Sequence, residues 1–100
     1  MKYNKLVRDR IPEYIKSKGK IPITHIASDQ EYWEKLKEKL QEEVGEFQQA
    51  ENAEEFADIL EVLDAISEYK NFNKNEVQKI KERKAGERGK FKDRIILDES

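Results

Sequence analysis

The sequence predicts a mainly all-α fold built around a helical hairpin, and three observations lead to this prediction. Apolar residues recur at three- and four-residue spacing through most of the chain, which is the period of an amphipathic helix. Two long segments with this spacing, residues 30–50 and 53–70, are joined by a very short connection, which makes neighbouring helices antiparallel. The chain has 100 residues, which suits a single domain over 1–100. We therefore expect a hairpin within a four-helix-bundle-like arrangement.

The first helix is expected over residues 4–18. Pro12 lies inside this pattern, and it either opens a new helix at its first turn or kinks the first one. Gly19 is the expected C-cap. The apolar positions of the segment are Leu6, Val7, Ile11, Tyr14 and Ile15.

Two short segments have the composition of strands. Residues 21–26 alternate β-branched and polar side chains and contain Pro22, which favours an edge strand. Residues 93–97 contain the adjacent pair Ile95 and Ile96. We expect these two segments to pair with each other.

Three further helices follow from apolar periodicity and capping residues. Ser28 or Asp29 begins the helix at 30–50, and Asn52 begins the helix at 53–70. A polar break, NFNKN, leads into a fourth helix at 74–85. The second helix has the stripe Trp33, Leu36, Leu40, Val44 and Phe47, and the third has Phe56, Ile59, Leu60, Leu63 and Ile66.

Charge is segregated along the chain, although the net charge is only −2. Residues 1–20 carry seven Lys/Arg and two acids, a net of +5, and residues 31–68 carry thirteen acids and three Lys, a net of −10. Residues 79–94 carry eight Lys/Arg and three acids, again +5. This pattern fits either solvated helix faces or an acidic metal site flanked by anion-binding ends. Nucleic-acid binding is not expected, because the balance is acidic and no groove-reading motif is present.

Four acids of the hairpin segments flank the apolar stripes. On a helical wheel, Glu43 lies about 60° and Glu46 about 120° from the centre of the second helix's stripe. Glu55 lies about 50° and Asp58 about 110° from the centre of the third helix's stripe. Because all four lie near the connection, we expect them to be close together across the hairpin.

Carboxylates brought together at a half-buried position repel one another and need partners. Their oxygens are the ligands that Mg²⁺ or Mn²⁺ prefers, so the pattern points to a divalent metal site. The alternative is an acid-rich helix surface that holds no ion. A di-iron site fits poorly, because it uses Glu-x-x-His pairs and the single histidine, His25, lies in the extended segment.

Basic residues near both ends are candidates for phosphate binding. Lys5 and Arg8 are three apart, and Lys84 and Arg88 are four apart and followed by Gly89. Arg matches phosphate oxygens with two parallel hydrogen bonds. The alternative is a soluble helix end whose cations complement the helix dipole.

Together these segments resemble the MazG-like nucleotide pyrophosphohydrolases, an all-α superfamily that includes the phosphoribosyl-ATP pyrophosphohydrolases. The stretch YNKLVRDRIPEYI resembles the N-terminal signature of a small branch, and ERGKF and RIIL resemble its end. The stretches KLQEEVGEF and EEFADILEVLDAI resemble the family's E-x-x-E and E-x-x-D elements. The resemblance spans nearly the whole chain. Only eight residues separate the two acidic elements, fewer than in larger members, which implies a smaller pocket or a different nucleotide.

The resemblance implies a Mg²⁺-dependent hydrolase, with Mn²⁺ as the other candidate ion. Its substrate would be a nucleoside triphosphate, cleaved between the α and β phosphates to a monophosphate and pyrophosphate. Basic side chains such as Lys84 and Arg88 would offset charge on the leaving pyrophosphate. Glu42 or Glu61 would steer the attacking water. The implied metal ligands are Glu43, Glu46, Glu55 and Asp58.

The resemblance also implies a homodimer or homotetramer. Two other functions stay open: the phosphoribosyl-ATP pyrophosphohydrolase of histidine biosynthesis, and a non-catalytic helical dimerisation module. The chain has no cysteine, which excludes disulfides and thiolate zinc sites. It has no apolar run near the roughly 20 residues of a membrane span and no signal-peptide core, so we expect a cytoplasmic protein with no membrane partner.

Overall fold

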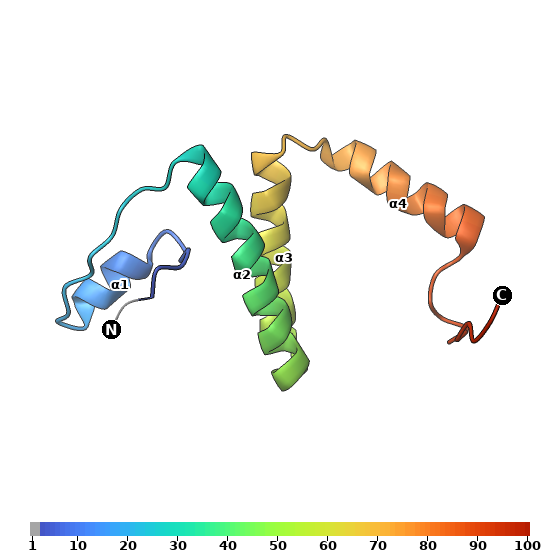
Figure 1. The fold of residues 1–100 in the computed structure, drawn as a ribbon, viewed down its shortest axis with the longest axis horizontal. Helices are drawn as coiled ribbons and strands as arrows, with labels where there is room; N and C mark the ends of the chain where they lie inside the picture. Colours follow the sequence, from blue (N-terminus) through green and yellow to red (C-terminus); the bar gives the residue numbers. More distant parts are fainter. Residues whose placement is uncertain (1–2) are drawn as a thin grey trace.

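The computed structural model describes residues 3–100, which form four helices joined by irregular segments (Figure 1). In chain order the helices are α1 (Ile11–Ser17), α2 (Asp29–Ala50), α3 (Ala53–Tyr69) and α4 (Lys74–Arg88). No strand forms within residues 3–100, so the predicted all-α class is confirmed. None of these helices combines the length and the apolar content needed to cross a bilayer.

Helices α2 and α3 form an antiparallel hairpin at the centre of the molecule (Figure 1). Its turn is set by two residues. Glu51 adopts a left-handed φ of 51°, and its N–H donates to the carbonyl of Phe47 over 2.7 Å, which closes α2. The side chain of Asn52 accepts a 2.9 Å hydrogen bond from the N–H of Glu55, which opens α3 as predicted.

The seam between α2 and α3 holds the core of the molecule. Leu36 and Val62 are the buried apolar residues among those described. At the open end of the hairpin, Tyr69 stacks on Trp33 with ring centroids 5.4 Å apart. The ammonium of Lys70 lies 4.4 Å from the centroid of the same indole ring. Burial of apolar and aromatic surface along this seam is what holds the two helices together.

The first helix is shorter than the predicted 4–18. Residues 3–10 are irregular, and α1 begins at Ile11 with Pro12 in its first turn. Of the two alternatives for Pro12, the structure shows the one in which it opens a helix. The C-cap of α1 is Lys18 rather than the predicted Gly19. Gly19 is the next residue, has a φ of 80°, and donates its N–H to the carbonyl of Lys16 over 2.9 Å.

The structure corrects the prediction of two paired strands. Residues 21–26 and 93–97 form no strand, and they lie on opposite sides of the hairpin (Figure 1). Ile23 is 98% exposed and Ile95 is 82% exposed. Their composition favours an extended backbone, but a strand also needs a hydrogen-bonded neighbour, and the hairpin keeps the two segments apart.

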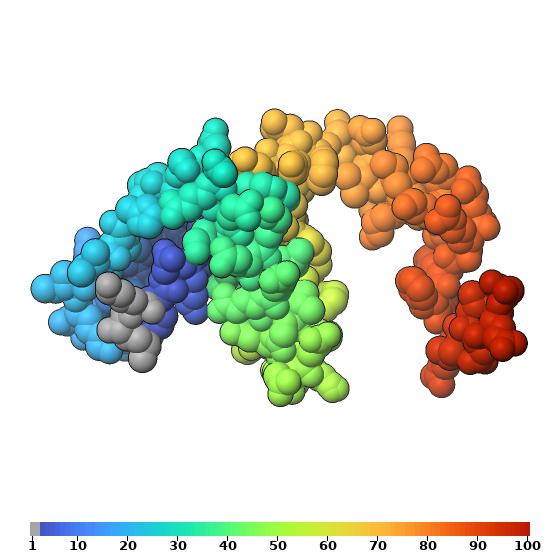
Figure 2. Space-filling model, viewed as in Figure 1, coloured from blue at the N-terminus to red at the C-terminus, as the bar shows by residue number. Residues whose placement is uncertain are grey.

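A four-helix bundle is not completed within one chain. Among the described helices, only α2 and α3 pack extensively on each other. Helix α4 and the residues after it, which we call the C-terminal arm (residues 74–100), project away from the hairpin (Figures 1 and 2). The radius of gyration is 18.0 Å, whereas a compact domain of this length has about 13 Å.

Candidate functional site

Three acidic side chains converge on one face of the hairpin. Glu43 of α2 and Glu55 and Asp58 of α3 each offer a carboxylate oxygen, and these oxygens all lie within 4.8 Å of one another. Glu55 and Asp58 share a face of α3 because they are three residues apart. The two-residue turn then sets α3 against α2 so that this face meets Glu43. We call these three residues the acidic cluster.

Two oxygens of the acidic cluster lack hydrogen-bond partners. Oε2 of Glu43 and Oε2 of Glu55 are buried and accept no hydrogen bond from any described residue. The side chain of Glu43 is only 9% exposed. A buried carboxylate oxygen without a donor costs about 1–3 kcal/mol or more, and folded proteins rarely leave such groups unpaired. The arrangement is therefore unfavourable without a positive ligand.

Glu55 reaches the acidic cluster because of where α3 begins. It is the third residue after the capping Asn52, and acids are favoured there by the helix dipole. In a capping box this side chain would bond back to the backbone N–H of Asn52. No such bond is present among the described residues, and the carboxylate instead faces Glu43 and Asp58.

Glu46, the fourth predicted ligand, stays outside the acidic cluster. Its side chain is exposed on α2, in keeping with its position farthest from the apolar stripe on the helical wheel. Its charge still acts on the site, because the negative charge of Glu46 contributes to the raised pKa of Glu43. The structure thus brings together three of the four predicted ligands.

Lys39 is the nearest positive charge to Glu43 on the same helix. Its Nζ lies 3.3 Å from Oε1 of Glu43. Burial raises the pKa of the Glu43 carboxyl, contact with Lys39 partly opposes this, and the net pKa lies above the usual range. For Lys39 itself, burial lowers the pKa, but contacts with Glu42 and Glu43 outweigh it and the net pKa is raised.

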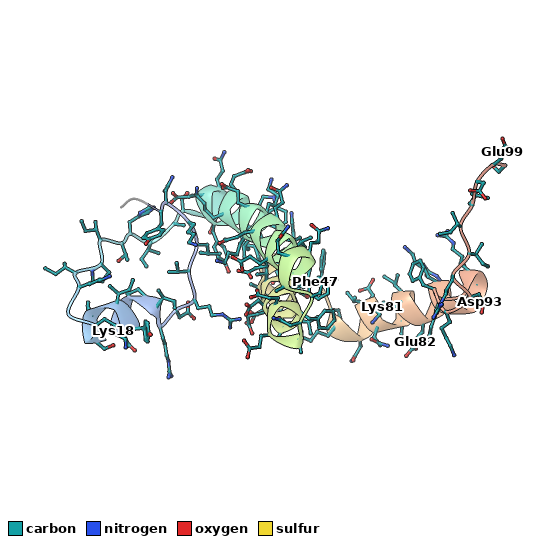
Figure 3. All side chains as sticks on the ribbon, turned by 90° about the horizontal axis from the view of Figure 1, so that it is seen from below. Lys18, Phe47, Lys81, Glu82, Asp93 and Glu99 are labelled. Carbon is teal, nitrogen blue, oxygen red and sulfur yellow. The ribbon has the colours of Figure 1, made fainter. Side chains whose placement is uncertain are left out.

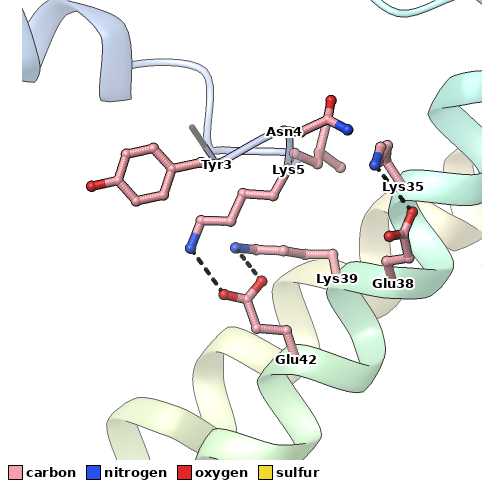
Figure 4. Close-up of a pocket in the computed structure, with 8 residues that line it drawn as sticks. Tyr3, Asn4, Lys5, Lys35, Glu38, Lys39 and Glu42 are labelled. Atoms are coloured by element: carbon pink, nitrogen blue, oxygen red, sulfur yellow. Dashed lines mark hydrogen bonds and ion pairs between the residues drawn. The ribbon is translucent and has the colours of Figure 1, made fainter. Parts of the chain in front are cut away.

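Glu42 is held between two lysines rather than in the acidic cluster (Figure 4). Lys5 donates to its Oε1 over 3.1 Å, and Lys39 donates to its Oε2 over 3.1 Å. Burial raises the pKa of Glu42, but the hydrogen bonds and charges of the two lysines outweigh it, and the net pKa is lowered. Lys5 and Glu42 line a cavity of about 220 Å³ between the N-terminal segment and α2.

Arg8 approaches the acidic cluster from the N-terminal segment. Its Nη2 donates to Oδ1 of Asp58 over 2.8 Å, and its Nη1 lies 4.0 Å from Oε1 of Glu61. Arg8, Glu43, Asp58 and Glu61 line a cavity of about 350 Å³ together with apolar residues of the seam. A negatively charged ligand in this cavity would meet both the guanidinium and any cation that the carboxylates hold.

Lys84 and Arg88, the other predicted phosphate-binding pair, lie on α4. The C-terminal arm extends away from the hairpin, as Figure 3 shows with Lys81 and Glu82 labelled on α4 and Phe47 on the hairpin. Within one chain the structure therefore does not bring Lys84 and Arg88 to the acidic cluster. Their spacing predicts a shared helix face, but the direction of that helix depends on tertiary contacts.

Lys39 is the site residue that the sequence analysis missed. Its side chain is only 18% exposed, and it contacts both Glu42 and Glu43. The signal for it was present in the sequence, since Lys39 lies three and four residues before these two acids on one helix. Such pairs are common on exposed helix faces, so spacing alone did not single it out.

The acidic cluster suits a hard divalent cation. All of its donors are carboxylate oxygens from helices, and Glu43 and Glu55 each carry a buried, unpaired Oε2. Oxygen donors favour Mg²⁺, Mn²⁺ or Ca²⁺ over the softer metals that prefer sulfur or imidazole. Glu43, Glu55 and Asp58 are the residues that would hold such an ion.

Comparisons with known proteins give one partial match. The chain is 52% identical over 46 residues to an uncharacterized protein of Mycolicibacterium smegmatis, and the match covers 46% of this chain and 47% of that protein. The chain thus matches about half the length of this relative. No family model matches the sequence, and no solved structure matches the fold.

Proposed function

We propose that this chain is a divalent-cation-dependent nucleotide pyrophosphohydrolase of the MazG-like type, with Mg²⁺ or Mn²⁺ as its cofactor. One observation carries the proposal: Glu43 and Glu55 each have a buried oxygen without a hydrogen-bond partner, and both carboxylates converge with Asp58. A bound cation would offset the free-energy cost of burying these oxygens without hydrogen-bond donors. The acidic elements that supply them are the ones that resemble the family.

The residues around the acidic cluster have distinct roles in this proposal. Glu43, Glu55 and Asp58 hold the cation, which supplies a Lewis acid and a positive charge for the phosphate oxygens. Arg8 pairs with Asp58 of α3 and Lys5 with Glu42 of α2, and in this proposal both bind phosphate groups of the substrate. The scissile bond is the one between the α and β phosphates.

Glu61 is better placed than Glu42 to orient the attacking water. Glu61 lines the same 350 Å³ cavity as Glu43 and Asp58, and its side chain is 61% exposed. Glu42 lines the smaller cavity, and its two oxygens already accept hydrogen bonds from Lys5 and Lys39. Its lowered pKa also makes it the weaker base.

A turnover assay tests the proposal. The purified chain is incubated with Mg²⁺ and a panel of nucleoside triphosphates and phosphoribosyl-ATP, and released pyrophosphate is measured. Asp58→Asn is expected to lose on the order of 10²-fold or more in turnover, whereas the exposed Asp64→Asn is expected to keep it. Release from several triphosphates supports the proposal, and release from phosphoribosyl-ATP alone assigns the histidine-biosynthesis reaction. No turnover together with no Mg²⁺-dependent rise in Tm contradicts both and leaves a non-catalytic dimerisation module.

We also propose that the active form is a homodimer or homotetramer. Phe56, Leu60 and Leu63 are exposed on α3 and share one face of it. This face lies roughly opposite Asp58, because two residues turn the helix by about 200°. A second copy packed on this face would bury apolar surface and leave the 350 Å³ cavity open. The large radius of gyration supports the same proposal, since small chains often complete their cores by association.

A further inference from the structure

Arg8 is the residue that neutralises the acidic cluster from outside the hairpin. It is 50 residues away from Asp58 in the sequence, and it lies in the irregular segment 3–10. Its 2.8 Å hydrogen bond is made to the carboxylate of Asp58, which is also one of the three that converge with Glu43. Arg8 and a cation bound by the acidic cluster would therefore compete for Asp58.

We propose that Arg8 is an internal counter-cation that changes partners: it leaves Asp58 and Glu61 when a divalent cation binds the acidic cluster, and it then binds the phosphates of the nucleotide. This inference rests on the proposed function, because it concerns the regulation of the same site. It assigns the N-terminal segment a role in coupling cation binding to substrate binding.

The contacts that hold Arg8 are weak enough for such an exchange. The side chain of Arg8 is 56% exposed and that of Asp58 is 38% exposed, so water already reaches the ion pair. Exposed ion pairs shift an equilibrium by less than about fivefold. The segment's other ion pair, between Lys5 and Glu42, also lies at the surface. No helix holds residues 3–10 in place.

Charge balance gives the exchange its direction. Without a metal ion, Arg8 and Lys39 supply the positive charge nearest to the acidic cluster. A divalent cation brings two positive charges to the carboxylates of the acidic cluster, so the ion pair with Arg8 then adds less to the stability of Asp58. Phosphates drawn to the cation then offer Arg8 a new anion that matches its planar donors. Lys39 cannot exchange in this way, because it is only 18% exposed between Glu42 and Glu43.

Calorimetric titration with Mn²⁺ tests the first step. We expect Arg8→Gln to bind Mn²⁺ about two- to fivefold more tightly than the unsubstituted chain, because the competitor for Asp58 is gone. Arg10→Gln is the matched control. It removes the same charge two residues away, where the described residues provide no ion pair, and we expect unchanged Mn²⁺ affinity.

Titration of the Mn²⁺-loaded chain with a nonhydrolysable nucleoside triphosphate tests the second step. We expect Arg8→Gln to bind this ligand roughly tenfold more weakly, because a charge-assisted hydrogen bond is lost. Arg8→Lys keeps the charge but not the planar donors. It should bind Mn²⁺ like the unsubstituted chain and still bind the triphosphate more weakly. Far-UV circular dichroism checks that each variant keeps its helices.

The outcomes separate the inference from the proposed function. Opposite shifts in Arg8→Gln, tighter for Mn²⁺ and weaker for the triphosphate, support the exchange. If the unsubstituted chain binds Mn²⁺ but Arg8→Gln shows no tighter binding, the exchange is wrong and the metal site stands. Tighter Mn²⁺ binding with unchanged triphosphate affinity overturns the second step. Failure of the unsubstituted chain to bind Mn²⁺ or Mg²⁺ at all overturns the proposed function, and the exchange with it.

Discussion

At the scale of single residues, Glu43 is in an unfavourable environment for a charged group. Its carboxyl is buried, one of its oxygens has no donor, and its pKa is raised mainly by burial. A carboxyl whose pKa is higher in the folded chain binds its proton more tightly there. It therefore favours folding most at acidic pH, and this contribution falls as the pH rises from the ordinary value of 4.5 through the folded pKa. At neutral pH, Glu43 destabilises the metal-free fold.

Glu43→Gln should accordingly stabilise the metal-free chain at pH 7. We expect a gain of about 1 kcal/mol in the free energy of unfolding, because burying an amide costs less than burying a carboxylate with one unpaired oxygen. Near pH 4.5 the gain should shrink, because the raised pKa of Glu43 keeps a larger share of its carboxyl neutral in the folded chain. Urea denaturation at both pH values measures the difference, and Asp64→Asn should stay within about 0.5 kcal/mol. A loss of stability at pH 7 would instead assign the carboxylate a structural role.

Protons and cations would compete for the carboxylate of Glu43, so Mn²⁺ affinity should fall as the pH is lowered. The raised pKa of Glu43 makes this fall begin at a higher pH than for an ordinary glutamate. Part of the rise comes from the charge of Glu46. In Glu46→Gln the fall should therefore begin at a lower pH, which a series of calorimetric titrations would measure. An unchanged pH profile in Glu46→Gln would contradict an effect of the Glu46 charge on cation binding through Glu43.

The residue types and spacings of the acidic cluster were predictable from the sequence, but the long-range contacts of its side chains were not. The wheel placed Glu43 and Glu55 nearest the seam, and the structure has both in the acidic cluster. Glu46 lay farthest from its stripe, and it faces solvent. The contact of Arg8 with Asp58 spans 50 residues. No local pattern encodes a contact of that range, because it depends on how an irregular segment crosses the hairpin.

At the scale of helices, capping residues fix the hairpin. The sequence located α2 and α3 to within one residue at each end, because strong caps coincide with the limits of apolar periodicity. Helix α4 continues to Arg88, beyond the predicted end at residue 85, because Gly86 is accommodated within it. The prediction of two strands was wrong, because composition indicates an extended backbone but does not show whether a second strand lies close enough to pair with it.

The cap at Asn52 positions Glu55 as well as starting α3. Asn52→Ala should cost about 1 kcal/mol and accelerate hydrogen exchange of the α2–α3 amides about fivefold. It should also weaken Mn²⁺ binding, because the N–H of Glu55 is the group that donates to the side chain of Asn52. Asn73→Ala is the matched control, since it removes the same type of cap from α4 and leaves the hairpin unchanged. Equal effects of the two variants on hairpin exchange would contradict a local role for Asn52.

At the scale of the whole molecule, many large apolar side chains are exposed to solvent. Phe56, Leu60 and Leu63 leave an apolar face of α3 exposed, and the C-terminal arm adds exposed residues such as Phe91 and Leu97. The all-α class and the lengths of α2 and α3 were predictable from the helical spacing of apolar residues. The open shape was not predictable, because amphipathic helices indicate that a face is buried without indicating which chain covers it.

Leu60→Glu should therefore shift the chain to a monomer. A charge at the centre of the exposed α3 face would have to be buried against a second copy, which costs several kcal/mol. Light scattering coupled to size-exclusion chromatography would measure the mass. Asn75→Glu, which adds the same charge to an exposed position of α4, should keep the mass of the unsubstituted chain. A monomeric unsubstituted chain at high concentration would contradict the proposed association.

The aromatic stack at the open end of the hairpin gives this molecule an intrinsic optical probe. Trp33 is its single tryptophan, and it is stacked on Tyr69 with Lys70 beside the ring. Indole emission therefore originates at one known place, where the start of α2 meets the end of α3. Separation of these helix ends would expose the ring to water and red-shift the emission, so opening of the hairpin can be timed in a stopped-flow instrument without attaching a dye.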